Sequence, residues 1–179
     1  RGLDALASLG AVASGASLTD FGQTIADMPL EPRLAAVVAN ATDLSSALRV
    51  ASLLDEDTAK GGDVDLARRP VDARALNRLA KRLGIEEATG PGDALGAALA
   101  VGFRDLIAQR RGDASYGGTV YLLANGKTAR LDAADGPEFI VVADAGTGDD
   151  GQCRIYAYAT LVREELEPYA SSSRRVFAV

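Results

Sequence analysis

Two predicted strands in the second half of this chain carry tyrosine and arginine side chains on one face. Residues 119–124 and 127–131 alternate in hydrophobicity around Asn125-Gly126, a pair that supplies the positive φ angles of a tight hairpin turn. With those two residues as the loop, Tyr121 lies across from Arg130 on the outer face. The opposite, core face of the hairpin then holds Val120, Leu122, Ala129 and Leu131.

A later strand, predicted over residues 153–162, repeats this pattern. Alternation points Arg154, Tyr156 and Tyr158 outward, and it points Ile155, Ala157, Ala159 and Leu161 inward. Proteins that bind single-stranded nucleic acid stack bases on aromatic rings and hold phosphates with cations, so the pattern is typical of such a face. A purely structural role suits the same residues, because Tyr is favoured at half-exposed strand positions and Arg commonly covers it.

A second basic pattern lies in the first half of the chain. Arg74, Arg78 and Arg82 follow one another at a spacing of four residues, and residues 60–82 hold seven basic side chains against three acidic ones. A helix with this spacing presents the three arginines on one face. The face is either a solvated surface or a contact for an anionic partner.

Most catalytic chemistry is excluded by residue type. The chain has no His and a single Cys, Cys153, so imidazole catalysis, zinc sites built from Cys and His, and intrachain disulfides are ruled out. The phosphate-binding pattern G-x-x-x-x-G-K-[ST] is absent. Gly146, Gly148 and Gly151 match G-x-G-x-x-G, but a strand rather than a helix is predicted next, which favours a hairpin loop. Runs of carboxylates are interpreted as solvated surface.

Capping residues and apolar spacing predict the elements that position these side chains. Helices are predicted to begin at Thr19, Pro32, Asp43, Asp72 and Asp93. The Asp72 helix is predicted to end before Gly84, where a left-handed turn is easiest for glycine. The Asp93 helix is predicted to run to Gly112 and to include Arg110 and Arg111. Beyond residue 112 the period changes to two, and several short strands predict a small barrel, with a short helix over residues 163–166.

Composition sets the outer bounds on this fold. The 179 residues are 47% hydrophobic and 25% charged with a net charge of −6, which fits one sizeable globular domain or two small ones. We expect a boundary near Gly112, no membrane segment, and a reducing, cytoplasmic location, given the single cysteine. The start at Arg1 and the apolar run at residues 176–179, which is typical of a strand, lead us to expect a fragment of a longer protein.

Several strings in this order resemble a known family. Residues 2–6, Leu18-Thr19 with Gly22, and residues 28–34 (MPLEPRL) resemble the helicase-associated region of DEAH-type helicases. Residues 103–112 (FRDLIAQRRG), 121–126 (YLLANG) and 129–132 (ARLD) are similar to the bacterial HrpB-type group of that family. The resemblance covers residue 1 to about residue 162.

The resemblance implies an α+β fold. Residues 1–112 would form a helical bundle, made of a winged-helix remnant and ratchet-like helices, and residues 113–179 a small antiparallel OB-like β-barrel. Both would follow two RecA-like ATPase domains that use ATP and Mg²⁺, so no cofactor is expected in this chain. The expected partners are those RecA-like domains and single-stranded RNA or DNA.

The resemblance and the strand pattern together define the expected contacts. Nucleic acid would be held by Arg110, Arg111, Tyr121, Lys127, Arg130, Arg154, Tyr156 and Tyr158, with no catalytic residue and no metal site in the chain. A protein-interaction or scaffolding module without nucleic-acid contact is the alternative, in which the same face meets another domain.

Overall fold

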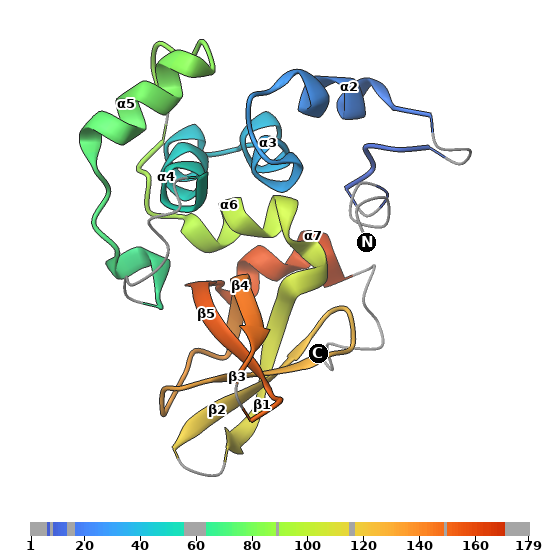
Figure 1. The fold of residues 1–179 in the computed structure, drawn as a ribbon, viewed down its shortest axis with the longest axis vertical. Helices are drawn as coiled ribbons and strands as arrows, with labels where there is room; N and C mark the ends of the chain where they lie inside the picture. Colours follow the sequence, from blue (N-terminus) through green and yellow to red (C-terminus); the bar gives the residue numbers. More distant parts are fainter. Residues whose placement is uncertain are drawn as a thin grey trace.

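The computed structural model describes residues 7, 9–13, 17–55, 64–88, 90–114, 117–148 and 150–170. Helices gather at one end and a five-stranded barrel lies at the other (Figure 1), which confirms the α+β class. The predictions for residues 1–6 and 176–179 lie outside the described residues. The helices are α2 (Asp20–Asp27), α3 (Pro32–Ala39), α4 (Leu44–Asp55), α5 (Ala73–Arg82), α6 (Leu95–Gly102) and α7 (Glu167–Ala170), and the 3-10 turns are η2 (Leu66–Arg68), η3 (Arg104–Leu106) and η4 (Arg163–Leu166). The strands are β1 (Ile107–Ala114), β2 (Gly118–Leu123), β3 (Thr128–Leu131), β4 (Phe139–Thr147) and β5 (Cys153–Thr160).

The first helices begin where their capping residues predict. Thr19 Oγ1 accepts a hydrogen bond from the backbone N–H of Gly22 at 2.9 Å, and Asp72 Oδ1 accepts one from Arg74 at 2.9 Å. Pro32 is the first residue of α3, where its missing N–H leaves no helical hydrogen bond unmade. Gly84 follows α5 with a φ of +70°, as predicted for a left-handed turn.

Asp43 both caps α4 and fixes the segment before α6. Its carboxylate accepts hydrogen bonds from the backbone N–H of Ser46 (3.1 Å), the Ser46 hydroxyl (2.6 Å) and the backbone N–H of Gly92 (3.2 Å). The Ser46 Oγ in turn accepts from the backbone N–H of Ala94 at 2.9 Å. Burial acts to raise the pKa of Asp43, but these hydrogen bonds outweigh it and hold the pKa below its ordinary value.

Replacing Asp43 tests this cap. Asp43→Ala should lower the free energy of unfolding at neutral pH by about 1–2 kcal/mol. Because the folded-state pKa is depressed, the stabilisation is present above the unfolded-state pKa of about 3.9 and is lost as the pH falls through the folded value. Urea unfolding between neutral and acidic pH measures it. Asp20→Ala, an exposed carboxylate in the first turn of α2, is the control; a pH-independent difference for Asp43→Ala would contradict the linkage.

The helix predicted from Asp93 to Gly112 is wrong at both ends. Helix α6 covers only Leu95–Gly102, and its N-cap residue, Ala94, makes no side-chain cap hydrogen bond. Ile107 instead opens β1 and pairs with Val141 of β4. A short apolar run fits a helix stripe and a strand equally well, and here the cross-strand pairing decides. The barrel therefore begins five residues before the predicted boundary at Gly112, and the division into domains at 1–112 and 113–179 stays a prediction.

The five strands close into a barrel in the order β1-β2-β3-β5-β4. All pairings are antiparallel except that of β3 with β5, where Arg130 and Arg154 are partners in a parallel pair. This is the OB-like barrel that was expected, except that one of its strand pairs is parallel. Its interior is filled by Ala108, Tyr121, Leu123, Ala129, Leu131, Ile140, Val142, Ile155 and Tyr158.

The β2–β3 hairpin exists as predicted, but its register is shifted by one residue. Tyr121 pairs with Ala129, and the backbone N–H of Leu123 donates to the carbonyl of Lys127 at 2.8 Å, which leaves a three-residue loop. Only Gly126 in that loop has a positive φ (+82°), so the two-residue turn with positive φ at both positions does not form. A register shift of one residue exchanges the two faces of β2, so Val120 and Leu122 face away from the core.

A bulge in β5 changes which alternate side chains point into the barrel. Tyr158 pairs with Val142, Ala157 with Asp144, and Ile155 with Ala145, so Tyr156 is an extra residue on β5. Beyond it Tyr158 points into the barrel interior. The predicted inward set is therefore split, since Ile155 lies in the barrel whereas Ala157, Ala159 and Leu161 belong to the core under the helices.

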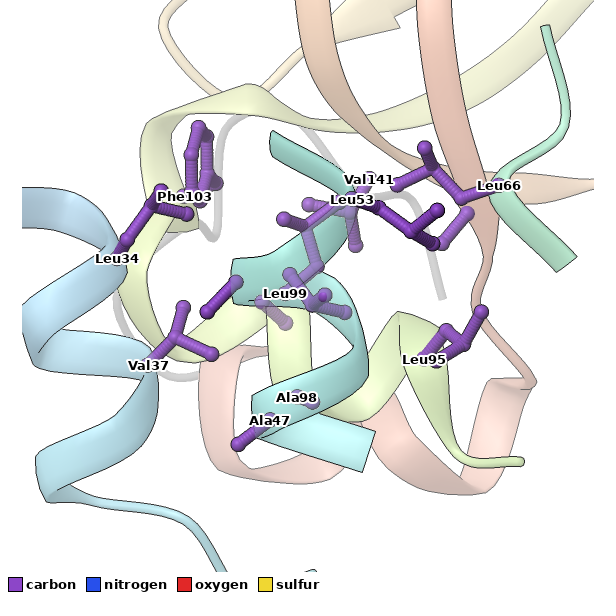
Figure 2. Packing of buried hydrophobic residues seen from close by; sticks show 14 of the residues in the cluster. Leu34, Val37, Ala47, Leu53, Leu66, Leu95, Ala98, Leu99, Phe103 and Val141 are labelled. Carbon is purple, nitrogen blue, oxygen red and sulfur yellow. The ribbon is translucent and has the colours of Figure 1, made fainter. Parts of the chain in front are cut away.

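Helix α6 lies in the middle of that second core and joins the helices to the barrel. Figure 2 shows side chains from α3, α4 and α6 in one cluster with Val141 of β4. Two glycines let the backbones touch: a Cβ at Gly96 would lie 1.9 Å from the carbonyl oxygen of Thr160, and one at Gly102 would lie 2.3 Å from that of Arg33. Among the described residues, no helix has the length and apolar character to cross a membrane.

Gly96→Ala measures this close approach. Helix propensity alone would favour Ala by about 1 kcal/mol. Forcing a methyl group into a packed contact costs about 1–3 kcal/mol, and at 1.9 Å from a backbone oxygen the cost should win. We expect a net loss of about 1 kcal/mol or more in urea unfolding. Ala97→Gly on the same helix calibrates the propensity effect, and a more stable Gly96→Ala protein would disprove the backbone contact.

Candidate nucleic-acid interface

The residues predicted to contact nucleic acid separate into an interior pair and a surface group. Tyr121 is 0% exposed and Tyr158 is 9% exposed, so both predictions of an outward stacking ring are wrong. The hairpin register buries Tyr121, and the β5 bulge buries Tyr158. The remaining predicted residues reach the surface on β1, on the β2–β3 loop, on β3 and on β5: Arg110, Arg111, Lys127, Arg130, Arg154 and Tyr156.

Arg130 and Arg154 are brought together where β3 meets β5. They are direct partners in the parallel pairing, so their side chains leave neighbouring strands side by side. Glycines make room for both: a Cβ at Gly118 would lie 2.8 Å from Arg130 Nε, and one at Gly148 would lie 2.6 Å from Arg154 Nε. A hollow of about 570 Å³ opens beside them, with Lys127 and Arg130 in its wall.

Aspartates hold the two arginines in place. Asp132 lies 2.9 Å from Arg130 Nε and 3.3 Å from a terminal nitrogen of Arg154. Asp150 accepts a second hydrogen bond from Arg154 at 3.0 Å. That bond raises the pKa of Arg154 and lowers the pKa of Asp150. The result is a row of alternating charges in which each guanidinium has a fixed direction before any ligand arrives.

Tyr156 provides an accessible ring next to this row. Its side chain is 44% exposed, which confirms its predicted outward position. The ring lies over Gly146 of β4, where a Cβ would come within 3.1 Å of Tyr156 Cε2. Because Gly146 has no side chain, one side of the ring can lie against the β4 backbone, and its other side faces solvent. This arrangement can stack against a planar group such as a nucleobase.

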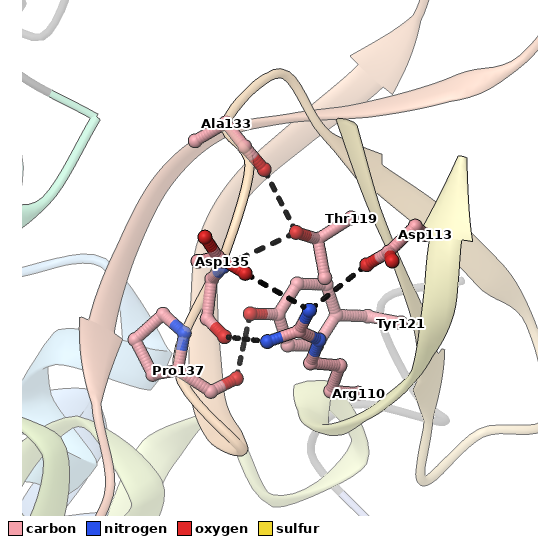
Figure 3. A network of polar contacts seen from close by, with 8 residues as sticks. Arg110, Asp113, Thr119, Tyr121, Ala133, Asp135 and Pro137 are labelled. Carbon is pink, nitrogen blue, oxygen red and sulfur yellow. Dashed lines mark hydrogen bonds and ion pairs between the residues drawn. The ribbon is translucent and has the colours of Figure 1, made fainter. Parts of the chain in front are cut away.

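A network on the neighbouring part of the barrel uses Arg110 and Tyr121 for a structural purpose (Figure 3). The Tyr121 hydroxyl donates to the carbonyl oxygen of Pro137 at 2.7 Å. Arg110 donates to the carbonyl oxygen of Gly136 at 3.2 Å and pairs with Asp113 at 2.8 Å and Asp135 at 3.6 Å. These bonds raise the pKa of Arg110, and burial raises that of Tyr121. Both residues therefore hold the β3–β4 loop, although Arg110 remains partly accessible.

Comparisons of the sequence and of the structure with known proteins both find similarity to HrpB. The ATP-dependent RNA helicase HrpB of Escherichia coli (strain K12) is 34% identical over 137 residues, which cover 73% of this chain and 16% of the relative. A crystal structure of the E. coli DExH-box NTPase HrpB superimposes with a TM-score of 0.74 at 28% identity and covers 97% of this chain. This chain belongs to the HrpB helicase family.

The relationship to HrpB extends over nearly the whole chain but over a small part of the relatives. A second crystal structure, of the E. coli DEAH/RHA helicase HrpB, covers 90% of this chain with a TM-score of 0.74 and 28% identity. The chain spans 16% of the curated HrpB sequence and 22% and 21% of the two HrpB structures. No protein-family model matches it.

Sequence reasoning missed the acidic half of this HrpB-type surface. Asp132 and Asp150 are not among the residues singled out from the sequence, yet they fix the arginines. Asp132 lies two residues after Arg130, hence on the same face of the strand, and that spacing could have indicated their pairing. Asp150 lies in the β4–β5 loop, four residues before Arg154. Their contact depends on the hairpin geometry, which spacing alone does not give.

The interior position of Tyr121 can be tested in this HrpB-type chain. Tyr121→Phe removes the hydrogen bond to Pro137 and leaves that carbonyl unpaired, so the free energy of unfolding should fall by about 1 kcal/mol. Tyr156→Phe, at an exposed position, should stay within about 0.5 kcal/mol of the natural protein. Urea unfolding followed by circular dichroism compares the two variants. Equal stabilities would contradict the interior assignment of Tyr121.

Proposed function

We propose that this chain is an accessory region of an HrpB-type ATP-dependent helicase and that it holds single-stranded RNA or DNA while a motor elsewhere in the protein moves the strand. The observation that carries the proposal is the exposed ring of Tyr156 beside the pre-oriented pair Arg130 and Arg154 on a barrel with OB-like strand order. OB barrels bind oligonucleotides on the β2–β3 face and its flanking loops. Family membership makes a nucleic-acid ligand the first candidate for that face.

The chemistry of the surface suits the backbone and bases of a single strand. Tyr156 offers a stacking surface, worth about 1–3 kcal/mol per base in proteins of this kind. Arg154, Arg130 and Lys127 supply cations that follow the phosphates, and Arg111 adds an exposed cation on β1. A phosphate arriving at Arg154 would take over the place of Asp132 or Asp150 without requiring the guanidinium to reorient.

Energy for strand movement would come from RecA-like domains. The sequence of this chain has no phosphate-binding loop pattern, so ATP and Mg²⁺ would be bound by those domains and not by this region. The RecA-like domains would then be its principal protein partner. The proposal places the whole protein in the cytoplasm, in agreement with a single cysteine that makes no disulfide.

A titration of the chain with labelled oligo-U and oligo-dT tests the proposal. Tyr156→Ala should weaken binding by about 1–3 kcal/mol, the value of one stacked base. Arg154→Gln should reduce the slope of log K against log salt by about 0.7, the value for one phosphate contact on a single strand. Val162→Ala, which shortens another exposed apolar side chain, is the control. Fluorescence anisotropy over a salt series measures both effects.

One observation favours the alternative of a protein-interaction or scaffolding module. Arg110, Arg130 and Arg154 each pair with a neighbouring aspartate, which reduces the positive potential that an anionic strand would meet. In that case a folded chain would show no oligonucleotide binding even at low salt. The same face would instead dock against another protein domain, and Tyr156→Ala would weaken that contact.

A further inference from the structure

Helix α5 is a basic element in an acidic protein. Acidic side chains outnumber basic ones by 25 to 19 in the chain, yet α5, with the sequence ARALNRLAKR, contains no acidic residue. Its basic residues recur at spacings that place them within about 100° of one another around the helix axis. All of them are exposed: Arg74, Arg78, Lys81 and Arg82. We refer to these four residues as the α5 basic face.

Helix stability does not explain this face. Lys81 and Arg82 lie in the last turn, where cations complement the helix dipole, but Arg74 lies in the first turn, where a cation opposes it. Arg74 and Arg78, and again Arg78 and Arg82, are like charges four residues apart, a spacing at which they repel. An acidic residue at position 74 or 78 would stabilise the helix better. The arrangement therefore points to a use outside the helix itself.

Neighbouring elements compensate only part of this charge, because Arg78 and Arg82 have partners. α5 packs its buried side chains, Ala75 and Leu79, toward α4. Asp55 of α4 pairs with Arg82. Among the described residues, Arg74 and Lys81 have no ion-pair partner. Arg78 and Arg82, together with Asp55, also line a hollow of about 370 Å³ between α4 and α5.

We infer that the α5 basic face binds the phosphate backbone of double-stranded nucleic acid, at a second site separate from the barrel. Figure 1 shows α5 at the edge of the helical end, and β2 and β3 at the other end of the molecule. α5 contains no aromatic residue, so it has no ring on which an unpaired base could stack. A row of cations along a helix suits the ligand with the densest backbone charge, and a duplex carries one negative charge per about 1.7 Å of its axis.

The experiment compares duplex and single-stranded probes on the full 179-residue chain. The double variant Arg74→Gln with Lys81→Gln removes two cations at exposed positions and keeps good helix formers. With a labelled RNA hairpin whose stem is fully paired, the slope of log K against log salt should fall by about 1.8, or about 0.9 per lost contact. The dissociation constant should rise on the order of tenfold at about 0.1 M salt. Asn77→Gln, an uncharged change on the exposed side of α5, should leave both quantities unchanged.

Further measurements test this proposal independently of the proposal for the barrel. A DNA hairpin should lose affinity as the RNA hairpin does, because the contacts are to the backbone. Tyr156→Ala should weaken oligo-U binding and leave the salt slope for the hairpin unchanged. If Tyr156→Ala does not weaken oligo-U binding, that result contradicts the proposal for the barrel and leaves the α5 proposal standing. The α5 proposal is overturned if the chain binds no hairpin at about 50 mM salt, or if the double variant binds hairpins with unchanged slope.

Discussion

The close contact of α6 with its two neighbours is the constraint on which the rest of the molecule depends. Gly96 lets the helix backbone touch the end of β5, and Gly102 lets it touch α3. Arg33 of α3 then reaches across the junction, bonding both oxygens of Asp105 at 2.7 and 3.0 Å and the carbonyl oxygen of Gly102 at 3.2 Å. A bidentate bond of this kind fixes direction as well as distance. The chain therefore leaves α6 at one angle and enters β1 already aligned with the barrel.

Local chemistry made the helix starts predictable, whereas the path after α6 depended on distant residues. Thr19, Asp43 and Asp72 cap helices through bonds that span at most three residues, so the sequence carries the whole signal. Ile107 belongs to a strand because Val141, more than thirty residues later, pairs with it. Nothing near Ile107 reports that partner. Apolar spacing therefore extended the predicted helix beyond Gly102 to Gly112.

The candidate site shows how one residue of register decides which side chains reach solvent. The existence of both hairpins was predictable from turn residues, but the first loop has three residues and the second strand pair contains a bulge. Each irregularity exchanges the inward-facing and outward-facing side chains over part of a strand. Tyr121 and Tyr158 consequently fill the barrel, and only Tyr156 keeps its predicted exposure. Irregular strand pairing of this kind leaves no local signal in the sequence, because the alternating pattern is compatible with either register.

The two basic surfaces differ in how their charge is held, and this difference sets what each can recognise. On the barrel, Asp132 and Asp150 fix the direction of Arg130 and Arg154. The long-range attraction of an anion is therefore weak, whereas the positions of the guanidinium groups are well defined at short range. On α5, Arg78 and Arg82 have partners, whereas Arg74 and Lys81 have no ion-pair partner among the described residues, so the direction of those two side chains is loose. Oriented, compensated arginines beside a ring favour a ligand with bases to stack, whereas a row of cations along one helix face favours a stiff polyanion. A helicase region that meets both a paired and an unpaired stretch of one nucleic acid would have use for each surface at its own end.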